Sequence, residues 1–200
     1  MYQDYIKRSI DFLVSGFFCL LCLPFFILIA LLIKIDSRGP IFFKQKRVGR
    51  NLIIFEVFKL RTMTHQDRKV GDKPVIGKAD GVTTLGFYLR RFKIDELPQL
   101  LNVLKGDMSL VGPRPSIPEQ LAQMTEQEKH RYSVRPGLTG LSQVSGNIHL
   151  SWKERYVYDL EYVDHISWID DIKIILKTFL IILFGEEKYL HKSKNLIKKK

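Results

Sequence analysis

The feature that most constrains this chain is an uncharged, strongly apolar run from Phe12 to Ile33, bounded by Asp11 and Lys34. At about 1.5 Å of rise per residue, a straight helix of that length would just span the hydrocarbon core of a bilayer. Few soluble helices are apolar on every face, so the run favours a membrane segment over a buried core helix. A secretory signal peptide fits poorly, because the residues after the run are basic and Pro40 directly follows the only small-residue pattern.

Two details favour a bent membrane segment over a simple span. Pro24 lies just past the middle of the run and cannot donate to the carbonyl of Leu20, so we expect a kink or a break there. Basic residues flank both ends, and such residues prefer the cytoplasmic side of a membrane; they are Lys7, Arg8, Lys34, Arg38, Lys44, Lys46, Arg47 and Arg50. Each arm of about ten residues is too short to cross a bilayer. We therefore predict a re-entrant helix-break-helix that enters and leaves by the same face.

Two cysteines, Cys19 and Cys22, lie inside this run. A structural zinc site needs four ligands, and the sequence has no second cysteine pair. We interpret both as small apolar side chains. The absence of a disulfide framework agrees with a cytoplasmic domain.

The C-terminal region combines a second apolar segment with a basic tail. Residues 172–184 are apolar except for Lys173, Lys177 and Thr178, and are too few to span a membrane. They predict a helix lying in the membrane interface, with a core helix as the alternative. The tail at residues 185–200 holds six lysines and two glutamates, and so contributes +4 of the chain's formal charge of +11. Beside an apolar helix, such a tail is expected to contact anionic lipid rather than only water.

Between these regions the pattern predicts a small polar domain. Residues 41–45 and 52–60 have the composition of two short strands, and the turn residues 48–51 between them predict a β-hairpin. In the second strand, alternation places Val57, Lys59 and Arg61 on one face and Phe58 and Leu60 on the other. Residues 65–82 are rich in polar residues, glycine and proline and predict a loop, and residues 85–92 predict a helix.

The segment at residues 95–106 carries helix signals at both ends. Asp95 is suited to an N-cap, Glu96 and Pro98 to the first turn, and Gly106 to the end of the helix. Leu97, Leu100, Leu101 and Leu104 predict an apolar stripe. On these residues alone, an acid pair such as Asp95–Glu96 is more often a helix cap than a catalytic pair, and the catalytic pair is the alternative.

Two proline-bound arginines suggest a site for phosphate groups. Arg114 stands between Pro113 and Pro115, and Arg135 precedes Pro136, so both arginines lie in stiff loops. A guanidinium held in this way suits bidentate binding of phosphate, although a purely structural turn is the alternative for each loop. With Lys59, Arg61, Arg90 and Arg91, these arginines predict a cationic site.

Several other classes of function leave no trace in the sequence. No phosphate-binding loop of the P-loop or Rossmann type and no G-x-S-x-G motif occurs, and the five histidines lack metal-ligand spacing. A pI near 9.6 would also suit nucleic acid, but no recognition motif is present and the apolar anchor argues against it. We expect no nucleic-acid partner; an anionic lipid or a nucleotide-sugar accounts for the same basic residues.

At this point the residues resemble a known family, the bacterial sugar transferases, which are monotopic polyprenyl-phosphate phosphoglycosyl transferases in their small, minimal catalytic form. The resemblance extends from Lys7 to Thr178. It rests on Lys7, Arg8 and Asp11 before the apolar run and on the motifs at residues 39–49, 58–63, 95–115, 135–144 and 171–174.

The resemblance implies a reaction and a set of site residues. Such enzymes transfer a sugar-1-phosphate from a UDP-sugar to undecaprenyl phosphate at the cytoplasmic face of the bacterial inner membrane, release UMP, and so start a surface glycan or glycoconjugate. They use Mg²⁺ and a covalent phospho-sugar aspartyl intermediate. Carried over, Asp95 would be the nucleophile and metal contact, with Glu96 beside it as the second catalytic acid. The substrate-binding positions would be Lys59, Arg90, Arg114 and Asp159. A basic, non-catalytic scaffold at the membrane surface is the competing hypothesis.

The sequence departs from the family pattern at two positions. Leu23 stands before Pro24 where many members have serine, which bears on the bend of the re-entrant helix. Asn147 stands after Gly146 where many members have arginine, which bears on the substrate site.

We predict an α+β, helix-rich fold in three segments. Residues 1–38 would form the membrane-embedded re-entrant helix and its flanks, and residues 39–184 a small cytoplasmic catalytic domain with a short β-hairpin and amphipathic interfacial helices. Residues 185–200 would form the polybasic tail. The sequence predicts neither the sugar nor the oligomeric state.

Overall fold

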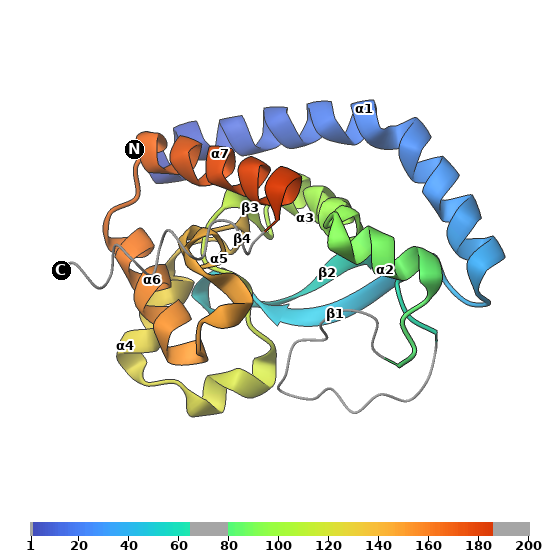
Figure 1. The fold of residues 1–200 in the computed structure, drawn as a ribbon. Helices are drawn as coiled ribbons and strands as arrows, with labels where there is room; N and C mark the ends of the chain where they lie inside the picture. Colours follow the sequence, from blue (N-terminus) through green and yellow to red (C-terminus); the bar gives the residue numbers. More distant parts are fainter. Residues whose placement is uncertain (1, 65–79, 186–200) are drawn as a thin grey trace.

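The computed structural model describes residues 2–64 and 80–185 (Figure 1). Most of the loop predicted at residues 65–82, and the tail predicted after Gly185, lie outside the described residues. The helices and strands are α1 (Lys7–Asp36), β1 (Phe42–Val48), β2 (Ile54–Leu60), α2 (Thr84–Arg91), α3 (Leu100–Lys105), β3 (Ser109–Val111), α4 (Glu126–Lys129), β4 (Gly137–Thr139), α5 (Leu141–Ser145), α6 (Trp152–Asp164) and α7 (Trp168–Phe184). Short helical turns join them: η1 (Tyr2–Ile6), η2 (Arg50–Leu52), η3 (Ile94–Gln99), η4 (Pro118–Gln123), η5 (His130–Ser133) and η6 (Asn147–His149). The helix-rich character and the small sheet agree with the predicted fold class.

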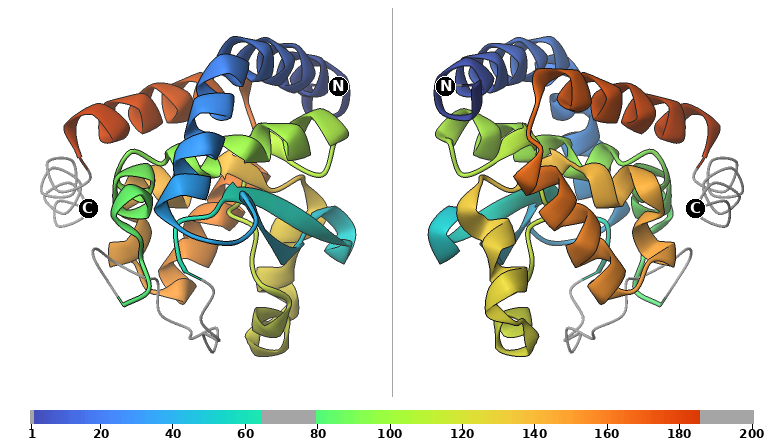
Figure 2. Two further views of the ribbon diagram at one scale, coloured as in Figure 1. Left: turned by 90° about the vertical axis from the view of Figure 1, so that its right-hand side faces the viewer. Right: turned by 90° about the vertical axis from the view of Figure 1, so that its left-hand side faces the viewer.

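The apolar run forms one continuous helix, α1, with Pro24 inside it. Figures 1 and 2 show that α1 is bent: one arm lies across α3 and the other descends toward β1. The kink is therefore confirmed, but the predicted break is wrong, because the chain accommodates the missing proline N–H by bending within the helix. Within the described residues, the helical segment Tyr2–Asp36 is the one long and apolar enough to cross a membrane. Most of its apolar side chains are exposed, so the core-helix alternative is wrong.

The first arm of α1 is fixed to the domain by buried polar groups. Lys7 Nζ lies 2.6 Å from Asp171 Oδ2 of α7, and both side chains are buried. The hydroxyls of Tyr2 and Tyr162 also donate to Asp171, each at 2.7 Å. One turn further along α1, Asp11 Oδ1 accepts a hydrogen bond of 3.0 Å from the backbone N–H of Leu110 in β3. Part of the motif before the apolar run thus joins α1 to α7 and β3.

The second arm of α1 packs against the same domain. Ile33 lies in a buried apolar cluster that includes Leu60 of β2 and Leu89 of α2. Arg61 follows β2 directly, and its Nη2 donates to the carbonyls of Ile33 and Ser37 at 3.1 and 2.6 Å. Both ends of the apolar helix are therefore held by one domain, while its middle is exposed.

The predicted hairpin is present, with shifted ends. β1 and β2 are antiparallel, with Gln45 opposite Val57 and Arg47 opposite Phe55. The turn comes later than predicted, because Asn51 and the residue after it take positive φ values of 54° and 63° between the strands. On β2, Val57 is buried against Met108 and Val103 of α3, as the predicted alternation requires.

The apolar C-terminal segment is helix α7, which begins four residues earlier than the apolar residues suggested. The Ser167 hydroxyl caps it by accepting from the N–H of Asp170. Only Asp171 and Ile174 are buried, and the remaining large apolar side chains from Trp168 to Phe184 are at least partly exposed. The core-helix alternative for this segment is wrong, and the exposed apolar surface agrees with the predicted interfacial helix.

Candidate active site

A cleft lies between the hairpin, η3 and the loop that follows β3. The charged or polar side chains that line it are Arg47 of β1, Lys59 of β2, Glu96 and Gln99 of η3, and Arg114 of the loop. Three of the positions predicted from the family resemblance are therefore adjacent in space, although their sequence separations are large.

Glu96 lies at the centre of this cluster. Its Oε1 accepts hydrogen bonds from Lys59 Nζ at 2.6 Å and from Arg114 Nη2 at 3.1 Å. Burial favours the protonated acid, but the charges of Lys59 and Arg114 outweigh burial and hold the pKa of Glu96 well below its ordinary range. Glu96 is thus an ionised carboxylate that holds two cations in place.

Asp95 has the opposite electrostatic character. Burial, followed by the negative charge of Glu96, raises the pKa of Asp95 to about 6, against the opposing influence of Lys59 and Arg90. In the part of the chain that the structure describes, the ion pairs do not include the Asp95 carboxylate. The two adjacent acids therefore differ in environment: Glu96 is ion-paired with two cations, and the pKa of Asp95 is raised.

The structure corrects the predicted N-cap. The N-cap of η3 is Lys93, which takes a left-handed conformation at φ 56°, and Asp95 lies inside the first turn of that 3₁₀ helix. The end of the segment is as predicted, since Gly106 ends α3 at φ 92°. The predicted apolar stripe is also partly wrong, because Leu101 is exposed.

The Arg114 loop is held by close backbone packing. β3 and β4 are parallel, and the N–H of Gly137 donates to the Pro113 carbonyl at 2.9 Å. A Cβ at Gly137 would lie 2.1 Å from the backbone nitrogen of Gly112, and one at Gly140 would lie 2.1 Å from its oxygen. The two proline–arginine loops therefore pack together through glycines that no larger residue can replace without backbone movement.

The two predicted arginine loops nevertheless present their side chains to different places. Arg114 reaches Glu96, whereas Arg135 Nε donates to the Gly106 carbonyl at 3.0 Å, at the end of α3. The predicted cationic site loses Arg61 as well, because its guanidinium is buried at the C-terminal end of α1. Arg90 lies near enough to Asp95 to lower its pKa, and Arg91 is exposed.

Asp159 is not among the residues that line the cleft. It is almost fully buried in α6, accepts from Arg131 Nε at 3.0 Å and from Ser142 Oγ at 2.8 Å, and is ion-paired with the Arg131 guanidinium. Arg131 Nη2 in turn donates to the Arg114 carbonyl at 2.7 Å, and its Nη1 donates to Ser116 Oγ. Asp159 therefore does not contact the cleft directly; it holds Arg131, which in turn hydrogen-bonds to the backbone of the Arg114 loop.

Comparison with known proteins assigns this arrangement to a family. Residues 2–185 match the family model described as bacterial sugar transferase. The chain belongs to the bacterial sugar transferase family. A relative from Caulobacter vibrioides, named UDP-glucose:undecaprenyl-phosphate glucose-1-phosphate transferase, is 40% identical over 93% of this chain and 73% of its own length.

Two further relatives show the range of the family. An exopolysaccharide production protein of Rhizobium meliloti is 34% identical over 92% of this chain and 88% of its own length. The UDP-N-acetylgalactosamine-undecaprenyl-phosphate N-acetylgalactosaminephosphotransferase of Aeromonas hydrophila is 35% identical over 90% of this chain and 44% of its own length. The names of the Caulobacter and Aeromonas proteins share an undecaprenyl-phosphate acceptor and differ in the sugar.

One cleft residue of this sugar transferase was absent from the predicted site. Arg47 Nη1 donates to the Pro115 carbonyl at 3.0 Å and Nη2 donates to Gln45 Oε1 at 2.6 Å. Burial and then the charge of Arg114 lower the pKa of Arg47 to about 10. The signal was available in the sequence, because the hairpin register places Arg47 on the same sheet face as Lys59.

A second residue outside the predicted site joins η3 and α3 to the sheet. Asn102 is fully buried in α3. Its Nδ2 donates to the Glu56 carbonyl at 2.7 Å, and its Oδ1 accepts from the Phe58 N–H at 3.1 Å. The amide thus hydrogen-bonds to β2 as a neighbouring strand would, on either side of Val57. It fixes the distance between β2, which carries Lys59, and the helix segment that carries Glu96.

The donor set of the cleft suits Mg²⁺ in one specific way. No group of three or more histidine, cysteine or acidic side chains that could enclose a metal occurs among the described residues. Mg²⁺ is usually held by one or two carboxylates together with substrate phosphates and water. Asp95 supplies one such carboxylate, whereas Glu96 is occupied by Lys59 and Arg114. The residues therefore fit a metal that is held jointly with a phosphorylated substrate.

Proposed function

We propose that this chain transfers a sugar-1-phosphate from a UDP-sugar to undecaprenyl phosphate, releasing UMP and forming an undecaprenyl-diphospho-sugar. The observation that carries the proposal is the contrast between Glu96, which lines the cationic cleft, and the adjacent Asp95, which lies close enough to Lys59 and Arg90 for their charges to lower its pKa. A reacting carboxylate must be close to phosphate-binding cations without being neutralised by them. Asp95 meets that condition, because Glu96 takes up Lys59 and Arg114.

The proposed reaction has two displacements. In the first, an Asp95 carboxylate oxygen attacks the phosphorus that carries the sugar, the bond from that phosphorus to the bridging oxygen breaks, and UMP departs with that oxygen and its electron pair. In the second, a phosphate oxygen of undecaprenyl phosphate attacks the same phosphorus and releases the Asp95 carboxylate. A covalent intermediate in this way divides one difficult transfer into two.

The cations of the cleft would stabilise the charge that develops on the phosphate oxygens. Lys59, Arg114 and Arg47 lie on three different elements around Glu96, so they are fixed before substrate arrives. Such pre-positioned charges are the main source of catalysis in phosphoryl transfer. Mg²⁺, held by Asp95 and by donor phosphate oxygens, would supply further charge neutralisation.

We also propose that α1 is re-entrant and that the catalytic domain faces the cytoplasm at the bacterial inner membrane. Both arms of α1 contact the same domain, through Lys7 and Asp171 at one end and through Ile33 and Leu89 at the other. A helix that crossed the bilayer would place its two ends on opposite sides, away from a shared domain. Exposed apolar residues on α7 would lie in the interface of the same leaflet.

Membrane fractions that contain the protein test the reaction. Wild type is expected to release UMP over many turnovers from UDP-glucose or UDP-N-acetylgalactosamine when undecaprenyl phosphate and Mg²⁺ are present, and at most one UMP per enzyme when the acceptor is omitted. Asp95→Asn should abolish UMP release and the phospho-sugar adduct seen by mass spectrometry, whereas Asp164→Asn, an exposed aspartate in α6, should retain both. Full activity of Asp95→Asn would exclude Asp95 as the nucleophile and favour the scaffold hypothesis.

Cysteine labelling tests the topology. In a background that lacks Cys19 and Cys22, single cysteines at Gln3 and Ser37 should react with the same membrane-impermeant reagent from the cytoplasmic side. Labelling of the two positions from opposite sides would exclude the re-entrant helix.

A further inference from the structure

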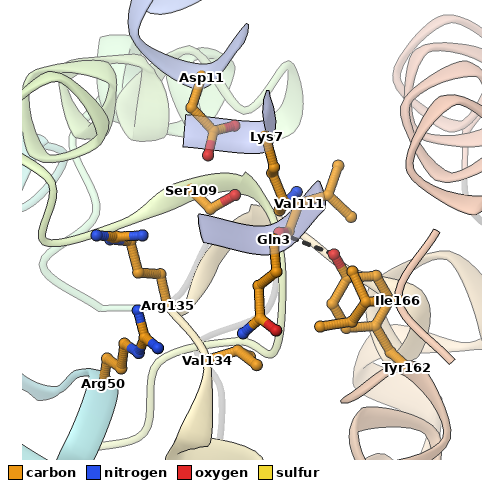
Figure 3. A pocket seen from close by; sticks show the side chains of 10 residues that line it. All are labelled: Gln3, Lys7, Asp11, Arg50, Ser109, Val111, Val134, Arg135, Tyr162 and Ile166. Carbon is orange, nitrogen blue, oxygen red and sulfur yellow. Dashed lines mark hydrogen bonds between the residues drawn. The ribbon is translucent and has the colours of Figure 1, made fainter. Parts of the chain in front are cut away.

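A second hollow lies apart from the cleft and shares none of its lining residues. It is enclosed by η1, the hairpin turn, β3 and the loop before β4, which contribute Gln3, Arg50, Ser109 and Arg135 (Figure 3). Figure 3 shows the guanidinium groups of Arg50 and Arg135 close to one another on one side of the hollow and Gln3 on the other. The proposed transfer reaction makes no use of these residues.

The two arginines hold their positions through backbone contacts. Arg50 Nε donates to the Ser133 carbonyl and Arg135 Nε donates to the Gly106 carbonyl, each at 3.0 Å. These bonds fix both side chains through Nε, Arg50 Nη1 also donates to Asp4 Oδ1 at 3.4 Å, and both arginines line the hollow. Burial, followed by the positive charges of Arg50 and Arg8, lowers the pKa of Arg135. Two fixed, mutually repelling guanidinium groups are a typical arrangement for an oxyanion.

The fixed charges around the hollow leave one positive charge unbalanced. Lys7 is neutralised by its ion pair with Asp171. The other charged groups near enough to shift the pKa of Arg135 are the cations Arg8 and Arg50 and the anions Asp11 and Asp4. Asp4 Oδ1 lies 3.4 Å from Arg50 Nη1. Three arginines against two aspartates give a net charge of +1, which a singly charged phosphodiester would neutralise.

A buried hydroxyl supplies an independent observation. Ser109 is 1% exposed, lines the hollow, and lies near Asp11. Its Oγ meets no strict hydrogen-bond geometry within the described part of the chain, and it lies close enough to the Asp11 carboxyl to lower the pKa of that group. A buried polar group without a partner costs free energy, so the Ser109 hydroxyl is available to a water molecule or to a ligand group in the cationic hollow.

The surroundings of the hollow favour a lipid as the source of the phosphate. Exposed apolar or aromatic side chains lie within three residues of three lining positions: Tyr5 follows Gln3, Ile53 follows Arg50, and Trp168 follows Ile166. A headgroup bound in the hollow would therefore leave its acyl chains near apolar side chains. The hollow also lies where η1 leads into the apolar helix α1.

We propose that this hollow binds the phosphate group of an anionic phospholipid, with Arg50 and Arg135 as the charged donors and Ser109 and Gln3 as neutral donors. The site would hold the N-terminal end of α1 at the membrane surface. It is separate from the cleft and takes a singly charged phosphodiester that is not consumed.

Native mass spectrometry of the full-length protein in neutral detergent tests the site. Phosphatidylglycerol and phosphatidylcholine of equal chain length are titrated separately, and inorganic phosphate is added as a competitor at matched concentration. Wild type should bind phosphatidylglycerol more tightly than phosphatidylcholine, and inorganic phosphate should not displace it. Arg50→Gln should weaken phosphatidylglycerol binding about tenfold, because a charge-assisted hydrogen bond is lost.

Two further variants separate a built site from general surface charge. Arg38→Gln removes the same charge from an exposed arginine after α1 and should leave phosphatidylglycerol affinity within about twofold of wild type. Ser109→Ala should weaken binding about fivefold, because a neutral donor to the phosphate is lost.

Three results would overturn the proposal. Equal effects of Arg50→Gln and Arg38→Gln would show only a diffuse attraction to anionic lipid. Unchanged affinity in both Arg50→Gln and Ser109→Ala would place the lipid elsewhere. Displacement of phosphatidylglycerol by inorganic phosphate at matched concentration would show a site for free oxyanions rather than for lipid.

Discussion

Replacing Asp159 with alanine removes the carboxylate that neutralises the buried guanidinium of Arg131. Both side chains are almost completely buried. Arg131 also donates to the Arg114 carbonyl and to Ser116, so the same guanidinium fixes the loop that carries a cleft cation. The substitution therefore leaves a buried charge unpaired and loosens the backbone beside the active site.

The magnitude follows from the burial of the pair. Removing one partner of a buried ion pair costs about 3–5 kcal/mol, because the remaining charge stays desolvated. For a chain of this size each kcal/mol lowers the melting temperature by about 2–4 °C, so a decrease of about 6–20 °C is expected. Asp164→Ala is the matched control: it lies on the same helix, and its carboxylate is exposed, 3.6 Å from His130. It should cost at most about 1 kcal/mol.

Thermal unfolding of the detergent-solubilised protein, followed by tryptophan fluorescence, measures this difference. The reasoning is refuted if Asp159→Ala melts within about 2 °C of Asp164→Ala. Asp159→Asn separates the structural role from direct substrate binding. Acting through Arg131 and Arg114, Asp159 should affect stability and kcat together. A raised KM for the UDP-sugar with unchanged melting temperature would instead place Asp159 in contact with substrate.

Three other predictions concern single groups. UMP release should fall as the pH drops through about 6, where Asp95 becomes protonated, and Glu96→Gln should move that limb to lower pH because it removes a negative charge that raises the Asp95 pKa; an unmoved limb in a pH–rate profile would contradict this assignment. Asn102→Ala should lower the free energy of unfolding by about 2–4 kcal/mol, because two buried backbone groups of β2 lose their partner; denaturant unfolding measures it, and a loss below about 1 kcal/mol would count against the bridging role. Lys7→Met should cost about 3–5 kcal/mol by leaving Asp171 buried without its cation, while membrane retention stays intact; a melting temperature equal to that of wild type would show that the pair is not needed.

The hairpin, the end of α3 and the bend of α1 were predicted correctly, because each depends on a few neighbouring residues. The hairpin followed from strand composition around a turn, the end of α3 from Gly106, and the bend of α1 from Pro24. In each case the cause lies within a few residues of the effect. Proline removes a hydrogen bond of its own helix, and glycine takes the positive φ that ends one.

The position of Asp95 depended on a conformation that the local pattern does not specify. An acidic residue followed by Glu96 and Pro98 fits an N-cap, but the left-handed residue is Lys93, so η3 begins before Asp95. The ion pairs of Glu96 with Lys59 and Arg114 then fix this turn from outside the helix. Tertiary contacts therefore set the helix start, and the acid pair lies inside the turn rather than before it.

Alternation along β2 failed at one position for a geometric reason. It predicted that Lys59 and Arg61 share a face, but Lys59 donates to Glu96, whereas Arg61, the residue after β2, donates to carbonyls at the C-terminal end of α1. Applied to the hairpin as a whole, the same alternation places Arg47 on the same face as Lys59, because opposite residues of antiparallel strands share a face. Counting faces across the register would have found Arg47, whereas the role of Arg61 depends on its contact with the end of α1.

The basic residues of the family motifs serve two different purposes, which their sequence cannot distinguish. Arg8 donates to two carbonyls near the C-terminal end of α3, at 2.5 and 2.8 Å, Arg135 donates to a third carbonyl there, and Arg61 donates to carbonyls at the end of α1. A helix C-terminus carries unsatisfied carbonyls and partial negative charge, so it attracts a guanidinium as a phosphate does. Arg114 and Lys59 differ only in that their partner is Glu96, a carboxylate beside an unpaired acid. Counting the basic residues of the motifs therefore gives too many phosphate-binding groups. The role of each basic residue is decided by the group it contacts in the structure.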